Sequence, residues 1–346
     1  MLNPNVTQIA YMPYAPFKEA FQIGDYNIWP YYKECGKRIG NSAVLETLNR
    51  YFSRYFEWKY DQEKGGYDKS LEVSIISPIS FAFGIDKLSD EQIEEIRTVS
   101  HIIAFSAITE EYCSLSSSDA FMLYIQNFTV GLEGIAVFNK YFTSLEMVKF
   151  TKPYHIDFPF EGFTKTSLCD VLGKAIELKS KEQIRRIFRT LELFFHTTTY
   201  AEMVTSEYKL LSLVMCFETL LDFSNKMKFM KKVEFMIDNY EPEMETRTIE
   251  INKEKKDFTK SKTCWWVYDL YNLRSAIIHG QEVNWDFKKY GYVSTRIEFG
   301  KILLRKLVKK ILLQESLWIP DTIDSIKEAE STDSRLKDII SRVRGI

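Results

Sequence analysis

The stretch WWVYDLYNLRSAIIHG, residues 265–280, decides how the second half of the chain is interpreted. Apolar residues recur in it at the three- and four-residue spacing of a helix packed on one face: Leu270, Leu273, Ile277 and the neighbouring Ile278. Gly280 follows them, and glycine is the residue type that most often ends a helix in the left-handed conformation. The sequence therefore predicts a buried helix whose last turns present Arg274 and His279.

Arg274 and His279 are the candidate functional groups at the end of this helix. Histidine gives and takes a proton readily near neutral pH, so His279 is a candidate acid–base group. Arg274 and His279 are five positions apart, about 140° around a helix at roughly 100° per residue. They flank the helix, and a site that uses both is expected to need a second copy of it. The alternative is structural, because an arginine and a histidine near a helix end also serve as an ion pair and a dipole cap.

The run LYNLRSAIIHG, residues 270–280, closely resembles the Arg-x4–6-His motif of the HEPN superfamily, in particular of its Apea-like branch. In that branch a tyrosine, Arg-Ser, an aliphatic pair and His-Gly recur together. The segment SEYKLLSLVMCFETLL, residues 206–221, is similar to the long first helix of that domain. The resemblance covers about 200–315, with lead-in helices from about 165, whereas the N-terminal half carries no such motif.

The resemblance implies a metal-independent endoribonuclease that acts as a homodimer on RNA, in bacterial antiphage defence or a toxin system, under an unknown trigger or regulatory partner. In the family's scheme a ribose 2′-hydroxyl attacks the adjacent phosphate. Carried over to this chain, His279 is the acid–base group and Arg274 binds the phosphate. The resemblance implies neither a cofactor nor a metal. The alternative is a catalytically inactive HEPN-like module for dimerisation or for binding nucleotide or RNA.

Three further residues are candidates to support such a site. Ser275 stands where several branches carry Asn or Asp, and it either donates to a phosphate oxygen or hydrogen-bonds locally. Asn272 precedes the arginine by two positions. Glu218 lies beside the apolar stripe of the helix expected at 205–222, where it either orients an arginine or is an ordinary exposed glutamate.

A basic stripe is expected on the helix predicted at 295–314. Its apolar positions form one face, and its basic residues are placed on the other: Lys301, Arg305, Lys306, Lys309 and Lys310. Such a stripe suits RNA phosphates, although many are only solvated helix faces.

The composition is that of a packed globular protein, with 45% hydrophobic residues in a chain of 346. A formal net charge of −2 gives no global signal for nucleic acid, so any RNA contact must be local. The five cysteines and four histidines show no zinc-site spacing, and Cys216 and Cys264 are expected to be buried thiols. The sequence shows no signal peptide and no apolar run of membrane length, so a cytoplasmic protein that does not enter a membrane is expected.

The expected fold class is α+β, with a mixed α/β domain over 1–160 and an all-α helical bundle over 165–320. Ser89 begins the clearest helix of the first domain, followed by strands expected at 121–130 and 135–142. The role expected for this domain is sensing or substrate selection. Residues 241–262 are highly charged and are expected to be a solvated excursion from the bundle. Residues 321–346 are expected to form a polar helical tail.

Overall fold

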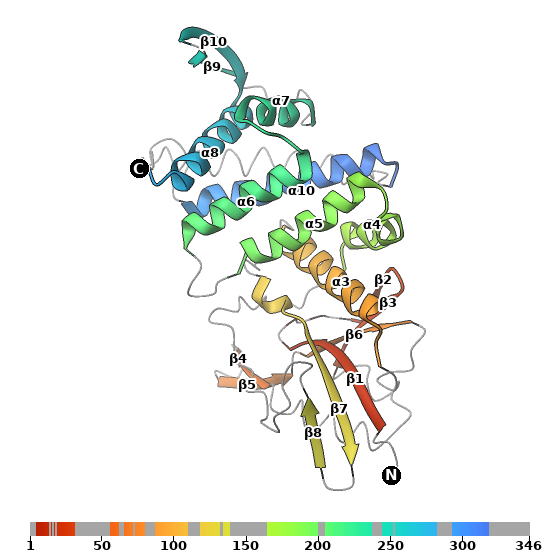
Figure 1. Cartoon of the computed structure of the whole chain (residues 1–346). Coiled ribbons are helices and arrows are strands. Elements are labelled where there is room, and N and C mark those ends of the chain that lie inside the picture. The colour runs from red at the N-terminus through yellow and green to blue at the C-terminus, as the bar shows by residue number, and fades with distance from the viewer. Residues whose placement is uncertain are drawn as a thin grey trace. The chain divides into compact units, whose positions relative to one another are not determined.

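The computed structural model describes residues 5–13, 15, 17, 19–31, 56–61, 66–71, 73–79, 87–109, 118–131, 134–138, 165–199, 205–236, 244–251, 253–281 and 293–317. The chain divides into two compact units, and the fold is α+β, as expected. Unit 1 comprises residues 1–178 and 198–202, and unit 2 comprises residues 179–197 and 203–346. The predicted tail at 321–346 lies outside the described residues. Figure 1 labels the helices and strands.

Unit 1 contains a six-stranded sheet in which every neighbouring pair is antiparallel. The spatial order of its strands is β2 (Phe21–Ile23), β3 (Tyr26–Pro30), β6 (Ser74–Pro78), β1 (Asn5–Met12), β7 (Tyr124–Gly131) and β8 (Gly134–Phe138). A separate hairpin joins β4 (Phe56–Asp61) to β5 (Gly66–Leu71). Strands β7 and β8 lie where the sequence predicted a pair, although residues 139–142 are outside the described part of the chain.

Helix α3 (Asp90–Ile108) starts where the sequence predicted. Ser89 accepts a hydrogen bond from the backbone N–H of Gln92 at 3.1 Å, and the Gln92 side chain accepts one from Ser89 at 2.9 Å. This reciprocal capping box satisfies two backbone donors that the first turn leaves open. The Tyr26 hydroxyl of β3 donates to Glu95, which joins the sheet to α3.

The boundary between the units corrects the predicted start of the helical domain at 165. Helix α4 (Ser167–Ala175) and the short 3₁₀ helix η2 (Ile176–Leu178) belong to unit 1, as does the 3₁₀ helix η1 (Ser118–Phe121). Gly173 explains the packing of α4, because a Cβ there would lie 2.8 Å from Ile23 Cγ2 and 2.9 Å from the backbone nitrogen of Gly24. The glycine lets the helix backbone touch the β2–β3 turn, so the segment read as a lead-in to the bundle packs with the sheet.

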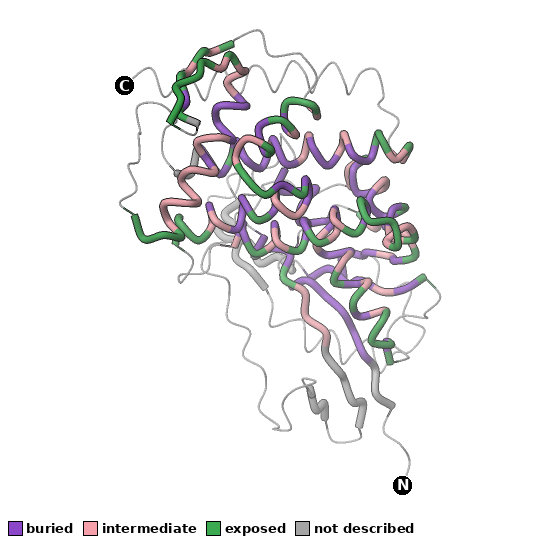
Figure 2. The backbone as a smooth tube through the Cα atoms, turned by 45° about the horizontal axis from the view of Figure 1, so that its top comes forward, coloured by how far each residue is buried: buried purple, intermediate pink, exposed green. Residues whose placement is uncertain are grey.

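Unit 2 is built from five helices within its described residues. They are α5 (Glu182–Thr197), α6 (Ser206–Leu221), α7 (Lys226–Met236), α8 (Lys262–Ile278) and α10 (Val293–Gln314). Helix α6 packs against α5, α8 and α10, and its apolar stripe is fully buried, as predicted. In Figure 2 the buried segments of these helices face one another.

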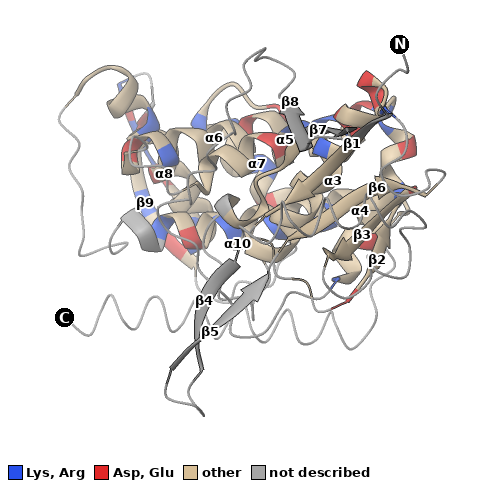
Figure 3. Cartoon of the chain, turned by 90° about the horizontal axis from the view of Figure 1, so that it is seen from below, with Lys and Arg blue, Asp and Glu red and all other residues tan. Residues whose placement is uncertain are grey.

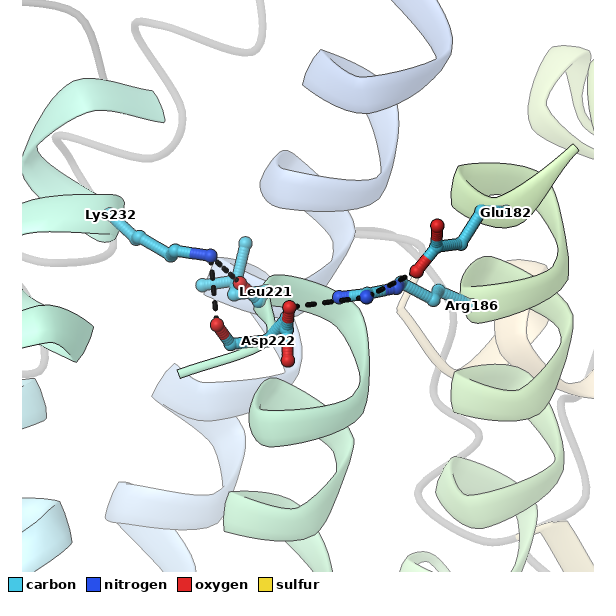
Figure 4. A network of polar contacts seen from close by, with 5 residues as sticks. All are labelled: Glu182, Arg186, Leu221, Asp222 and Lys232. Atoms are coloured by element: carbon cyan, nitrogen blue, oxygen red, sulfur yellow. Dashed lines mark hydrogen bonds and ion pairs between the residues drawn. The ribbon is translucent and has the colours of Figure 1, made fainter. Parts of the chain in front are cut away.

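A network of polar contacts joins three of these helices at the end of α6 (Figure 4). Asp222 caps α6 in the left-handed conformation, with φ +53°, which aspartate tolerates better than most residues. Arg186 of α5 pairs with Glu182 at 2.5 Å and with Asp222 at 3.1 Å. The Lys232 ammonium of α7 donates to the carbonyls of Leu221 and Asp222. A cation thus satisfies the carbonyls at the negative end of the helix dipole.

Residues 244–261 correct the expectations of an all-α unit and of a solvated excursion. They form a β-hairpin of two eight-residue strands, β9 (Met244–Ile251) and β10 (Glu254–Ser261), which pair in register from end to end. Exposure alternates along β9: residues at even positions from 244 to 250 are exposed, and those at 245, 247 and 249 are covered. This alternation is not visible as an apolar–polar pattern in the sequence, because charged residues occupy both faces. Lys253, with φ +67°, lies in the tight connection.

Helices α6 and α10 lie close together at Gly300. A Cβ on Gly300 would lie 2.4 Å from Leu213 Cδ2 and 3.3 Å from Leu213 Cδ1, and Leu213 is fully buried. A side chain at residue 300 would have to displace Leu213 within a close-packed interior, so the glycine permits the observed spacing of the two helices.

We expect Gly300→Ala to lower the free energy of unfolding by about 1–3 kcal/mol through overpacking, opposed by about 1 kcal/mol of improved helix propensity. Denaturant titration of Gly300→Ala, Leu213→Ala and the double variant measures the coupling. In the Leu213→Ala background the clash is removed, so Gly300→Ala should become neutral or stabilising. A loss of the same size in both backgrounds would contradict the contact.

Candidate functional site

Helix α8 carries the predicted motif, and its two halves differ in exposure. Thr263 to Val267 and Leu270 are buried, whereas every residue from Tyr271 to Ile277 is half-exposed and Ile278 is exposed. The predicted apolar stripe is therefore buried at Leu270 but not at Leu273, Ile277 or Ile278. The half of the helix that bears Arg274 is accessible.

The end of α8 has the predicted geometry. Gly280 adopts φ +62°, the left-handed conformation expected of a residue that stops a helix. His279 is the C-cap, and its backbone N–H donates to the Ser275 carbonyl at 3.1 Å. The imidazole is exposed, where a ligand can reach it. Ser275 thus supplies a backbone acceptor to the histidine, and its own side chain is half-exposed.

Glu218 of α6 and Arg274 of α8 form an ion pair. The Arg274 Nη2 atom lies 3.3 Å from Glu218 Oε1, and the two side chains retain 29% and 25% of their accessible surface. The guanidinium also lies over the Tyr271 ring, 5.4 Å from its centroid. Glu218 is thus in contact with an arginine, which was one of its two interpretations. The pair is held yet open on one side, so Arg274 can still donate to an anion.

Asn272 makes a contact that the sequence did not indicate. Its Oδ1 accepts a hydrogen bond from the Lys226 ammonium of α7 at 3.1 Å. The same ammonium lies over the Tyr268 ring, 4.5 Å from its centroid. Nothing in the local sequence marks Lys226, because its place depends on the packing of α7 against α8.

The basic stripe on α10 is narrower than predicted. Lys301 is only 4% exposed and pairs with Glu298 at 2.6 Å. It follows Ile297 by four positions and precedes Leu304 by three, so it lies on the buried face of the helix rather than on the basic face. The four other predicted contacts are half-buried: Arg305, Lys306, Lys309 and Lys310. In Figure 3 acidic residues are interspersed with basic ones around α8 and β9.

Three cysteines of the described chain are free and buried, as expected of structural thiols: Cys169, Cys216 and Cys264. Burial raises the pKa of the Cys216 thiol to about 12, so it stays protonated at neutral pH and is a poor nucleophile. Among the described residues, no three His, Cys, Asp or Glu side chains gather into a group able to hold a metal ion. Nor does any described helix have the length and apolar character that crossing a bilayer requires.

A scan of family models, a search of curated proteins and a search of solved structures each found no match to this chain. What the chain can do chemically at this place follows from the residues of α8 and from those that contact them.

Proposed function

We propose that unit 2 is a HEPN-like ribonuclease domain that cleaves RNA without a metal ion. The observation that carries the proposal is the Arg274–Glu218 ion pair, which holds the arginine of the motif at the accessible half of α8. The exposed His279 closes the same helix. The setting that the resemblance implies is bacterial antiphage defence or a toxin system, with unit 1 in sensing or substrate selection.

The proposed reaction is transfer of a phosphate ester within the RNA. His279 takes the proton of a ribose 2′-hydroxyl, the 2′ oxygen forms a bond to the adjacent phosphorus, and the bond from phosphorus to the 5′ oxygen breaks. That oxygen takes up a proton from solvent as it leaves, giving a 2′,3′-cyclic phosphate and a 5′-hydroxyl. Arg274 stabilises the charge that develops on the phosphate oxygens, and Glu218 positions the guanidinium.

The test of this activity is incubation of the purified protein with mixed cellular RNA in excess chelator. The expected products carry 2′,3′-cyclic phosphate ends and appear at the same rate with and without added divalent ions. Cleavage that requires a metal would overturn the proposed chemistry. A parent protein that cuts no RNA, even with extract from a cell in which its trigger is present, would favour the other candidate.

That second candidate is a HEPN-like module that binds nucleotide or RNA, or dimerises, without turnover. The observation in its favour is that each motif residue also has a structural contact. Arg274 is already paired with Glu218, and His279 caps α8 through its backbone. In that case both residues stabilise the helix end or hold a ligand.

The proposed active form is a twofold-symmetric dimer with a composite site. Large apolar side chains are exposed on the two helices that carry the ion pair: Tyr208 and Met215 on α6 at 54% and 48%, and Ile278 on α8 at 52%. Met215 precedes Glu218 by three positions and Ile278 follows Arg274 by four, so both lie one turn from the pair. A second copy that covers these residues would bring its own His279 to the site.

Light scattering over a concentration series is expected to give the mass of two chains. The double variant Met215→Glu with Ile278→Glu places like charges in a self-complementary contact, so it should shift the protein to a monomer and abolish cleavage with helical content unchanged. Phe235→Glu, on the exposed face of α7, is the matched control and should leave the dimer intact. A parent protein that stays monomeric at high concentration would exclude the composite site.

A further inference from the structure

One side of α8 carries a continuous line of polar side chains. Tyr268, Asn272, Ser275 and His279 follow one another at intervals of four, three and four residues. At roughly 100° per residue they fall within about 60° of one another around the helix axis. Arg274 lies on a different side of α8, where it pairs with Glu218 of α6.

Lys226 places a positive charge on this line. Its ammonium is held from two directions, by Asn272 Oδ1 at 3.1 Å and by the face of the Tyr268 ring at 4.5 Å. Lys226, Asn272 and Tyr268 are all half-exposed, so the group is oriented by the protein and still reachable from solvent. An ammonium has three donors, of which Asn272 engages one, and the amide group of Asn272 can itself donate to an anion.

The separation of Asn272 and His279 along α8 determines which phosphate of an RNA strand the Lys226 ammonium can contact. Asn272 precedes His279 by seven residues, about 10 Å at a rise of roughly 1.5 Å per residue. An RNA strand carries a phosphate at every nucleotide. A strand whose scissile phosphate lies at His279 and runs along the polar line therefore brings a neighbouring phosphate to Lys226.

We propose that Lys226, held by Asn272 and Tyr268, is a phosphate-binding subsite for the nucleotides next to the scissile bond. The inference rests on the proposed function for its substrate class, single-stranded RNA. It extends that function by assigning α7 a part in binding, and by making affinity depend on the length of the strand. A compact, strongly hydrated ammonium suits a phosphate approached from varying angles, whereas the fork of Arg274 suits the one held for reaction.

The test measures binding of RNA oligonucleotides over a series of salt concentrations, in a His279→Ala background in which the RNA stays intact. Each phosphate contact on a single strand contributes about 0.7 to the slope of log K against log salt. We expect Lys226→Met to reduce that slope by about 0.7 for an oligonucleotide of six nucleotides and to leave it unchanged for a dinucleotide. Lys226→Arg should retain the full slope.

Lys228→Met is the matched control. This exposed lysine lies two residues further along α7 and donates to Ser224, so the variant has the same net charge as Lys226→Met but leaves the polar line intact. It should not change the slope. Lys226→Gln is a second neutral variant, which can still donate to Asn272 and so retains the contact between α7 and α8. It should show the same reduced slope as Lys226→Met, which excludes a loss of folding as the cause.

The outcomes separate this inference from the proposed cleavage. If the parent protein cuts RNA and the two methionine variants have equal slopes, the subsite is wrong and the nuclease stands. If Lys226→Met has the reduced slope, Lys228→Met does not and the parent protein never cuts RNA, Lys226 binds a phosphate of the RNA and the proposed cleavage is wrong. If Lys226→Gln restores the full slope, the contact with Asn272 serves only to join α7 to α8, and the subsite is again wrong.

Discussion

Replacing His279 with alanine is expected to lower the rate of RNA cleavage by about 10²–10⁴, the usual contribution of a positioned acid–base group. Arg274→Ala should lower the rate and weaken RNA binding, because it removes the charge beside the scissile phosphate. Arg274→Lys should recover only part of the rate, since lysine keeps the charge and loses the planar fork. The measurement is the initial rate of oligonucleotide cleavage at saturating and at limiting RNA.

Glu218→Gln tests whether Glu218 acts by positioning the Arg274 guanidinium. The variant removes the negative charge 3.3 Å from Arg274, so RNA should bind more tightly while kcat falls because the guanidinium is less well held. Thermal unfolding of each variant controls for loss of structure. His279 is exposed, so its replacement should leave the midpoint nearly unchanged. A folded His279→Ala protein that cuts as fast as the parent would end the catalytic assignment.

Trp265→Ala is expected to have the largest effect on stability, about 3–5 kcal/mol. The indole is fully buried, its Nε1–H donates to the Glu245 carbonyl at 2.7 Å, and the Arg247 guanidinium stacks 4.6 Å from its ring. Arg247 in turn pairs with Asp269 of α8 at 2.8 Å. The substitution would leave a cavity and remove the contacts of the indole with Glu245 and Arg247 of the hairpin.

Chemical denaturation followed by circular dichroism gives the loss for Trp265→Ala. Trp265→Phe should cost less, because it retains much of the buried apolar area and loses mainly the hydrogen bond, about 1 kcal/mol. Phe235→Ala is the control for an exposed aromatic residue, since the ring is 76% exposed and its removal should change stability by less than about 0.5 kcal/mol. A Trp265→Ala protein as stable as Phe235→Ala would contradict the packing described for α8.

Features that depend on neighbouring residues in the chain were predictable. The start of α3 at Ser89, the left-handed Gly280 and the limits of α6 follow from local hydrogen bonding and side-chain period. Lys301 shows where the same reasoning failed. A lysine three and four residues from core positions lies on the buried face of the helix, yet its charge led to its placement among solvated residues.

Features that depend on distant residues were predictable only in part. The pairing of Glu218 with Arg274 was one of two interpretations, and 56 positions separate the two residues in the chain. Lys226 was missed because its contact with Asn272 follows from how α7 packs on α8. The β9–β10 hairpin was missed because salt bridges such as Lys260–Glu234, at 2.8 Å, place charges on the covered face, where an apolar residue is expected.

Strand β10 runs into α8 without a connecting loop. Ser261 ends the strand and is also the N-cap of the helix, where it accepts a hydrogen bond from the Cys264 N–H at 3.2 Å. The base of the hairpin is further fixed through Lys260 and Arg247. Its far end, between Ile251 and Glu254, is the place where natural length variation or a fused reporter can be accommodated. Pairs of residues inserted there would lengthen both strands away from α8. The base of the hairpin, and with it the orientation of Arg274 and His279 on α8, would stay unchanged.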